Sequence, residues 1–64
     1  EMKTCKYIIT ETGGIFVQSP TSVMGGWARH QWLKQHFKQE ISIASASMWE
    51  LLCEKYDVLE LEKE

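Results

Sequence analysis

Two short runs of aromatic and β-branched residues open the chain. They occupy residues 6–11 and 15–18, and Thr12-Gly13-Gly14 separates them. Such residues favour extended strands, and glycine supplies the positive φ that tight hairpin turns need. Alternate side chains of a strand point to opposite faces, so Tyr7 and Ile9 share one face. The pattern predicts an N-terminal β-hairpin.

A helix is predicted over residues 27–39. Residues 18–22 contain Pro20 and are expected to form a connection. Residues 27–39 contain neither proline nor glycine and are rich in Ala, Leu, Lys, Gln and Arg, which favour a helix. At 100° per residue a broad apolar arc forms on one side of the helix. The arc comprises Trp27, His30, Leu33, Phe37 and, continuing past the helix, Ile41.

The next segment changes from alternation to a helical repeat. Residues 40–45 alternate apolar and polar positions, which predicts a short strand or an extended link. Ser47 followed by Glu50 matches a capping box, so a second helix is expected from there. Its apolar side carries Met48, Trp49, Leu52, Cys53 and Tyr56, and its polar side carries Glu50, Glu54 and Asp57.

Leucines alternate with glutamates over residues 58–62, where a closing strand is favoured and a helix is the alternative. The elements together predict a small α+β domain: a hairpin, two helices with a short strand or extended link between them, and a C-terminal strand. Both helices are expected on one face of the sheet. The expected core residues are Phe16, Val17, Leu33, Phe37, Trp49, Leu52 and Tyr56.

Composition narrows the class of protein. With 64 residues the chain is expected to be one domain, residues 1–64, with room for only a small core and not for a deep catalytic pocket. Two cysteines are too few for a disulfide scaffold, and no segment has the pattern of a membrane span or a secretory leader. We therefore expect a cytoplasmic, non-enzymatic chain that contacts a protein partner or a second copy of itself.

The net charge of −2 conceals two poles. Residues 12–39 carry three basic residues and no acidic one, whereas residues 40–64 carry seven acidic residues against two basic ones. The two segments are expected either to complement each other or to meet partners. In one reading the acidic segment binds a basic protein. In another, nucleic acid binds Arg29, Lys34 and Lys38, although an acidic chain lacks the usual signature of such domains.

Two candidate contact surfaces follow. Trp32 falls outside the apolar arc of the first helix, near Arg29 and His36, and these residue types are enriched at binding hot spots. The alternative is that so small a domain buries Trp32 in its core. The second candidate surface is the acidic face formed by Glu50, Glu54 and Asp57.

Motifs for chemistry are missing. The four residues that suit zinc are not spaced as close ligand pairs, and neither glycine pair fits a phosphate-binding loop, so no metal or cofactor is expected. The four residues are Cys5, His30, His36 and Cys53. The function expected from the sequence is a small protein-binding module, a regulator or inhibitor that masks a larger partner. A nucleic-acid-binding domain using helix 27–39 is the alternative.

Overall fold

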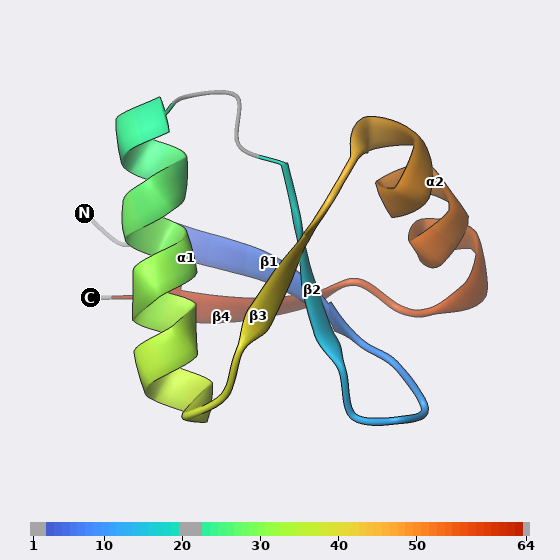
Figure 1. The fold of residues 1–64 in the computed structure, drawn as a ribbon, viewed down its shortest axis with the longest axis horizontal. Coiled ribbons are helices and arrows are strands. Elements are labelled where there is room, and N and C mark those ends of the chain that lie inside the picture. Colours follow the sequence, from blue (N-terminus) through green and yellow to red (C-terminus); the bar gives the residue numbers. More distant parts are fainter. Residues whose placement is uncertain (1–2, 20–22, 64) are drawn as a thin grey trace.

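A computed structural model describes residues 3–19 and 23–63, with side chains described for residues 4–19 and 28–62. The expected α+β fold is confirmed (Figure 1). The elements are β1 (Lys3–Ile9), β2 (Ile15–Gln18), α1 (Val23–Phe37), β3 (Ile41–Ala44), α2 (Ala46–Lys55) and β4 (Leu59–Lys63). The Trp27 side chain and residues 20–22 of the expected connection lie outside the described part.

The strands form one mixed sheet in the order β3-β2-β1-β4. β1 and β2 pair antiparallel as the expected hairpin, and Gly13 in the turn has φ 87°. β2 and β3 pair parallel, and parallel neighbours require a crossover connection. α1 provides this crossover. β4 pairs antiparallel with β1 over five residue pairs, which confirms the closing strand.

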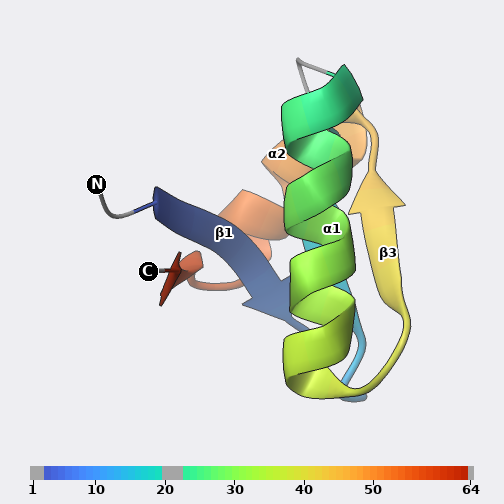
Figure 2. The same ribbon diagram turned by 90° about the vertical axis from the view of Figure 1, so that its left-hand side faces the viewer.

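The two helices cover opposite faces of the sheet, so the expectation that both lie on one face is wrong. α1 and α2 stand on either side of the strands in Figure 1, and α2 lies behind the sheet when α1 faces the viewer in Figure 2. Strand alternation explains the arrangement. In β2, Val17 points toward the cluster under α1, whereas Phe16 points toward the cluster under α2.

The core therefore consists of two clusters, one under each helix. The cluster under α1 has the buried residues Cys5, Ile15, Val17, Leu33 and Ile41. The cluster under α2 has Ile8, Ala44 and Trp49. Of the expected core, Val17, Leu33 and Trp49 are buried, whereas Phe16, Phe37, Leu52 and Tyr56 are half-buried at the margins. Cys53, expected on the apolar side of α2, is exposed.

Most element boundaries differ from those expected by one or two residues, and the largest shifts are in β1 and α1. β1 begins at Lys3 and ends at Ile9, because β4 pairs with its first residues and the turn takes residues 10–14. α1 begins at Val23 rather than at residue 27, so its first turns include the Gly25-Gly26 pair. It ends at Phe37, where Lys38 adopts the left-handed conformation, with φ 56°.

The second helix is capped by Ser45 and not by Ser47. Ser45 is extended, and its side-chain oxygen accepts a hydrogen bond from the Met48 backbone N–H at 3.3 Å. Ser47 already lies inside the helix, where its hydroxyl is 3.4 Å from that of Ser45. β3 ends at Ala44, so Ser45 is the first residue free to turn the chain. No helix in the described ranges is long and apolar enough to cross a membrane.

Candidate functional site

The contact surface expected on α1 divides into two parts. Trp32 is half-buried and packs against the core cluster under α1, while the exposed His36 stacks on it with ring centroids 5.6 Å apart. Arg29 is exposed one turn earlier and lines a cavity beside β1. Trp32 therefore packs against the core cluster under α1 with part of its side chain and is exposed to solvent with the rest. The two interpretations derived from the sequence, a buried core residue and an exposed contact residue, each describe part of this side chain.

The basic residues of α1 do not form one continuous cationic surface. Lys34 is half-buried and forms an ion pair with Glu40, with Nζ and Oε2 3.0 Å apart. Lys38 is exposed beyond the end of α1, and Arg29 points into the cavity. The pairing with Glu40 reduces the charge that Lys34 could offer a phosphate.

The expected acidic surface comprises Glu50 and Glu54 of α2 and Asp57, which lies beyond the end of the helix and not on it as expected. Glu50, Glu54 and Asp57 are exposed, and none forms an ion pair with the side chains that the structure describes. α2 also presents apolar side chains to solvent: Leu51 is 66% exposed and Met48 is 47% exposed. α2 therefore exposes both acidic side chains, Glu50 and Glu54, and apolar ones, Met48 and Leu51.

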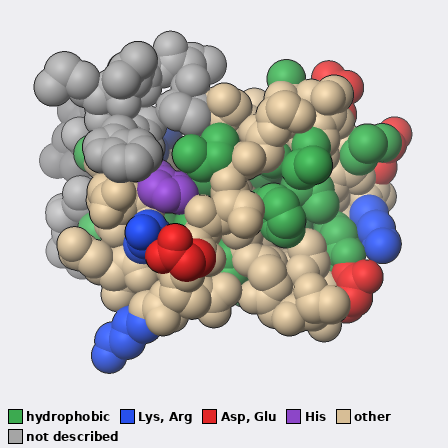
Figure 3. Space-filling view, viewed as in Figure 1, with side chains coloured by type: hydrophobic (Ala, Val, Ile, Leu, Met, Phe, Trp, Pro, Cys, Tyr) green, Lys and Arg blue, Asp and Glu red, His purple; other side chains and the backbone are tan. Residues whose placement is uncertain are grey.

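A shallow groove lies between α2 and the β1–β2 turn. Its volume is about 430 Å³, and its apolar lining comes from Phe16, Met48, Leu51, Leu52 and Tyr56. Hydrophobic side chains gather over the half of the molecule that carries α2, with charged groups at the margin (Figure 3). We call the groove between α2 and the β1–β2 turn the α2 groove. Its lining combines exposed apolar residues with a charged rim, as protein contact surfaces do.

Glu11 contacts Lys55 and Tyr56 at the rim of the α2 groove. Its carboxylate accepts a hydrogen bond from the Tyr56 hydroxyl and lies 3.5 Å from the Lys55 ammonium, which is itself 5.3 Å from the Tyr56 ring centroid. A hydrogen bond with its own backbone N–H lowers the pKa of the Glu11 carboxyl below its ordinary value, as do the charge and hydrogen bond of Lys55, while desolvation opposes the shift. The hairpin turn is thereby tied to the C-terminal end of α2.

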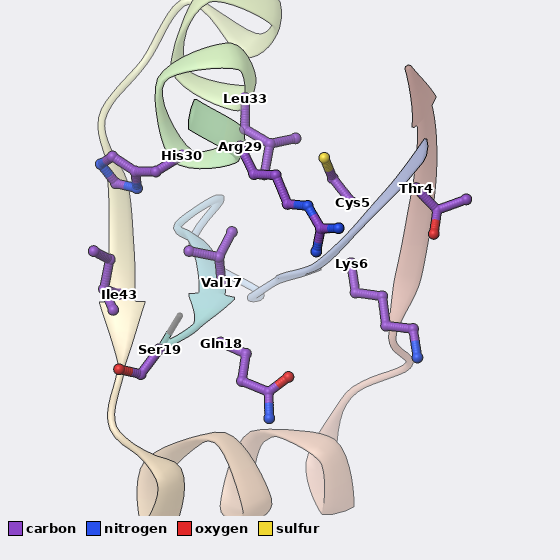
Figure 4. Close-up of a pocket in the computed structure, with 10 residues that line it drawn as sticks. All are labelled: Thr4, Cys5, Lys6, Val17, Gln18, Ser19, Arg29, His30, Leu33 and Ile43. Carbon is purple, nitrogen blue, oxygen red and sulfur yellow. The ribbon is translucent and has the colours of Figure 1, made fainter. Parts of the chain in front are cut away.

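A second concavity of about 310 Å³ lies where β1 and β2 separate. Val17, Leu33 and Ile43 contribute apolar walls, and Arg29 points from α1 toward Cys5 of β1 (Figure 4). We call this space the β1–β2 cavity. Its volume is at the lower end of the range for ligand pockets, about 300–1,000 Å³.

Sequence reasoning placed the acidic surface on α2 but missed both concavities. The groove joins α2 to a turn that precedes it by more than thirty residues, and no local pattern encodes that approach. One signal was present: Leu51 lies between the apolar and acidic positions of α2 without belonging to the repeat of Met48, Leu52 and Tyr56.

Among residues 3–19 and 23–63, no group of three or more His, Cys, Asp or Glu side chains is placed to hold a metal ion. Comparison of the whole chain with family models, curated proteins and solved structures finds no match.

Proposed function

We propose that this protein is a small protein-binding module and that the α2 groove is its contact surface. The observation that carries the proposal is the two-thirds exposure of Leu51, on a helix that buries Trp49 on its opposite side. A large aliphatic side chain this exposed gains roughly 1–2 kcal/mol when a partner covers it. Met48 and the half-buried Phe16 extend the apolar surface around it.

Charge indicates the chemistry of the partner. The exposed carboxylates of Glu50, Glu54 and Asp57 do not line the groove, and the ammonium of Lys55, which does, is paired with Glu11. A partner that places apolar side chains in the groove and basic side chains beside the acidic side of α2 complements this part of the chain, since opposite charges favour encounter and register. A module of 64 residues that covers a basic surface of a larger protein would act as a regulator or inhibitor.

The state of the two cysteines fits a reducing compartment such as the cytoplasm. Cys5 is buried and Cys53 is exposed, and neither takes part in a disulfide. An exposed thiol persists most readily where disulfide formation is disfavoured. This supports a cytoplasmic partner.

The test uses two helical probe peptides with the same pattern of leucines, one with lysine and the other with glutamate at every polar position. Binding is followed by the NMR shifts of the protein's amides. We expect the lysine peptide to shift the amides of α2 and of the hairpin turn. Leu51→Ser should weaken binding about tenfold, because burial of one aliphatic side chain contributes about 1.5 kcal/mol.

Val58→Ser is the matched control, since Val58 is also exposed, at 39%, but does not line the α2 groove. Its affinity for the lysine peptide should equal that of the parent protein. The proposal fails if Leu51→Ser binds as tightly as the parent, or if the shifted amides lie away from α2. Equal binding of the lysine and glutamate peptides would refute the expected partner charge.

Nucleic-acid binding through Arg29, Lys34 and Lys38 is the alternative function, and it has less support because Glu40 pairs with Lys34. It predicts a complex whose affinity falls steeply with salt. A gel-shift titration at low ionic strength tests it, and absence of a shifted band would eliminate it.

A further inference from the structure

The ladder between β1 and β2 stops while both strands continue. The paired residues are Ile8 with Phe16 and Ile9 with Ile15. Beyond them β1 extends back to Lys3 and β2 extends forward to Gln18. The two strands diverge from the hairpin end, as Figure 1 shows, and the β1–β2 cavity lies between them.

Backbone alternation shows which groups face this gap. The Thr10 N–H donates to the Gly14 carbonyl at 2.9 Å, and Ile8 pairs with Phe16, so the even-numbered residues of β1 direct their N–H and C=O groups toward β2. Lys6 follows this direction, whereas odd-numbered residues of β1 face β4. Within residues 3–19 and 23–63, Lys6 therefore has no ladder partner on its β2 side.

The opposing edge belongs to β2. The Ser19 N–H donates to the Ala44 carbonyl at 3.0 Å, so odd-numbered residues of β2 face β3 and Gln18 faces β1. Thr4, Lys6 and Gln18 all line the cavity. Its two edges thus offer both N–H donors and C=O acceptors, which an extended peptide can satisfy and a simple anion cannot.

The charge in the cavity has one sign. Arg29 points into it from α1, Lys6 stands on β1, and none of the described lining residues is acidic (Figure 4). Lys6 has Glu60 as its cross-strand neighbour on β4, whereas no described carboxylate forms an ion pair with Arg29. An Arg–carboxylate contact in such a site gains a charge-assisted hydrogen bond.

We propose that the β1–β2 cavity binds an extended acidic segment of a partner protein. The segment pairs with the edge of β1 at Thr4 and Lys6, which has no ladder partner on the β2 side among residues 3–19 and 23–63, and one of its carboxylates meets the Arg29 guanidinium. Thr4 and Lys6 span about 7 Å of strand, so a segment of about three residues is enough to pair with both. This site shares no lining residue with the α2 groove and does not depend on the function proposed there.

The experiment combines amide hydrogen exchange with peptide binding. Without peptide, the amide of Lys6 should exchange faster than those of Cys5 and Tyr7, which face β4. The probe is a blocked pentapeptide alternating glutamate and valine. Its addition should slow exchange at Lys6, and Arg29→Gln should weaken its binding about tenfold, the effect of losing about 1.4 kcal/mol.

Two peptides and one variant serve as controls. The same peptide N-methylated at its valines keeps the charges but loses backbone donors, and should bind at least tenfold more weakly; a lysine–valine peptide should not bind. Lys38→Gln removes an exposed cation outside the cavity and should leave the affinity unchanged.

Equal binding of the methylated peptide, or displacement of the acidic peptide by inorganic phosphate at similar concentration, would reduce the site to a simple anion site and overturn the proposal. Slow exchange at Lys6 that appears only as protein concentration rises would assign the gap to a second copy of the chain instead. Failure of these tests leaves the response of the α2 groove to its lysine peptide unaffected, so the two proposals are judged separately.

Discussion

Glu11 connects parts of the chain that local sequence keeps far apart. It lies in the hairpin turn, yet its carboxylate meets the Tyr56 hydroxyl and the Lys55 ammonium at the end of α2. The hydrogen bond with its own backbone N–H, and then the charge and hydrogen bond of Lys55, lower the pKa of the Glu11 carboxyl, so the charged form is favoured in the folded state. At the residue scale, the contribution of one exposed carboxylate to the free energy of unfolding therefore depends on pH.

The stability that Glu11 contributes should therefore decrease in acid. Because the pKa of Glu11 is lowered in the folded state from its ordinary value of 4.5, its contribution is fully present above about pH 4.5 and is lost as pH falls through the folded-state pKa. We expect the thermal midpoints of the parent and Glu11→Gln to converge below that pH. NMR titration of the Glu11 carboxyl gives the direct reading, and a midpoint at or above 4.5 would contradict this expectation.

Helix α2 illustrates how an element's boundary depends on what precedes it. Two serines stand near its start, and the sequence pattern favours Ser47 because Glu50 follows at capping-box spacing. The structure uses Ser45, because β3 keeps the chain extended up to Ala44 and the helix begins immediately after the turn. At the element scale, the end of β3 at Ala44 determines that Ser45 caps α2.

Alanine substitutions separate the two serines. Ser45→Ala should destabilise the protein by about 1 kcal/mol, since the Met48 N–H loses its acceptor, whereas Ser47→Ala should change stability by only a few tenths of a kcal/mol. Urea unfolding followed by tryptophan fluorescence measures both. A larger loss for Ser47→Ala than for Ser45→Ala would show that the capping box forms in solution.

The whole molecule is a sheet with a helix on each face and a core cluster under each helix. Leu33 is 1% exposed beneath α1, and Trp49 is 8% exposed in the cluster under α2. The clusters share the strands between them, so neither helix keeps its packing surface when the sheet opens. We expect the two clusters to unfold together in one transition.

Leu33→Ala tests this coupling. Truncation of a buried leucine costs about 2–5 kcal/mol, which is comparable to the total stability of roughly 3–5 kcal/mol for a core of this size. We expect most of the helical circular dichroism to be lost at 25 °C, including that of α2. Trp32→Ala, at a half-buried position, should lower the midpoint without unfolding the chain. Loss of α1 with α2 retained would contradict the single transition.

The sequence determined the kinds of elements and their order. Local propensity, glycine placement and periodicity are properties of neighbouring residues, so the hairpin, both helices, the strand at residues 41–44 and the closing strand could be predicted with boundaries shifted by a few residues. The acidic residues that the sequence placed on the polar side of the second helix, Glu50, Glu54 and Asp57, are exposed in the structure, although Asp57 lies beyond the end of α2. Segment charge identified the two poles that the net charge of −2 conceals.

Only the tertiary structure decided which faces the helices cover and where the concavities lie. Pairing of β4 with the first five residues of β1, and of β2 with β3, arranges four segments whose contacts are distant in sequence. That arrangement places α1 and α2 on opposite faces, exposes Leu51 and Cys53, and opens a gap between β1 and β2. Burial depends on the neighbours that the sheet brings together, and a one-dimensional pattern does not contain those neighbours.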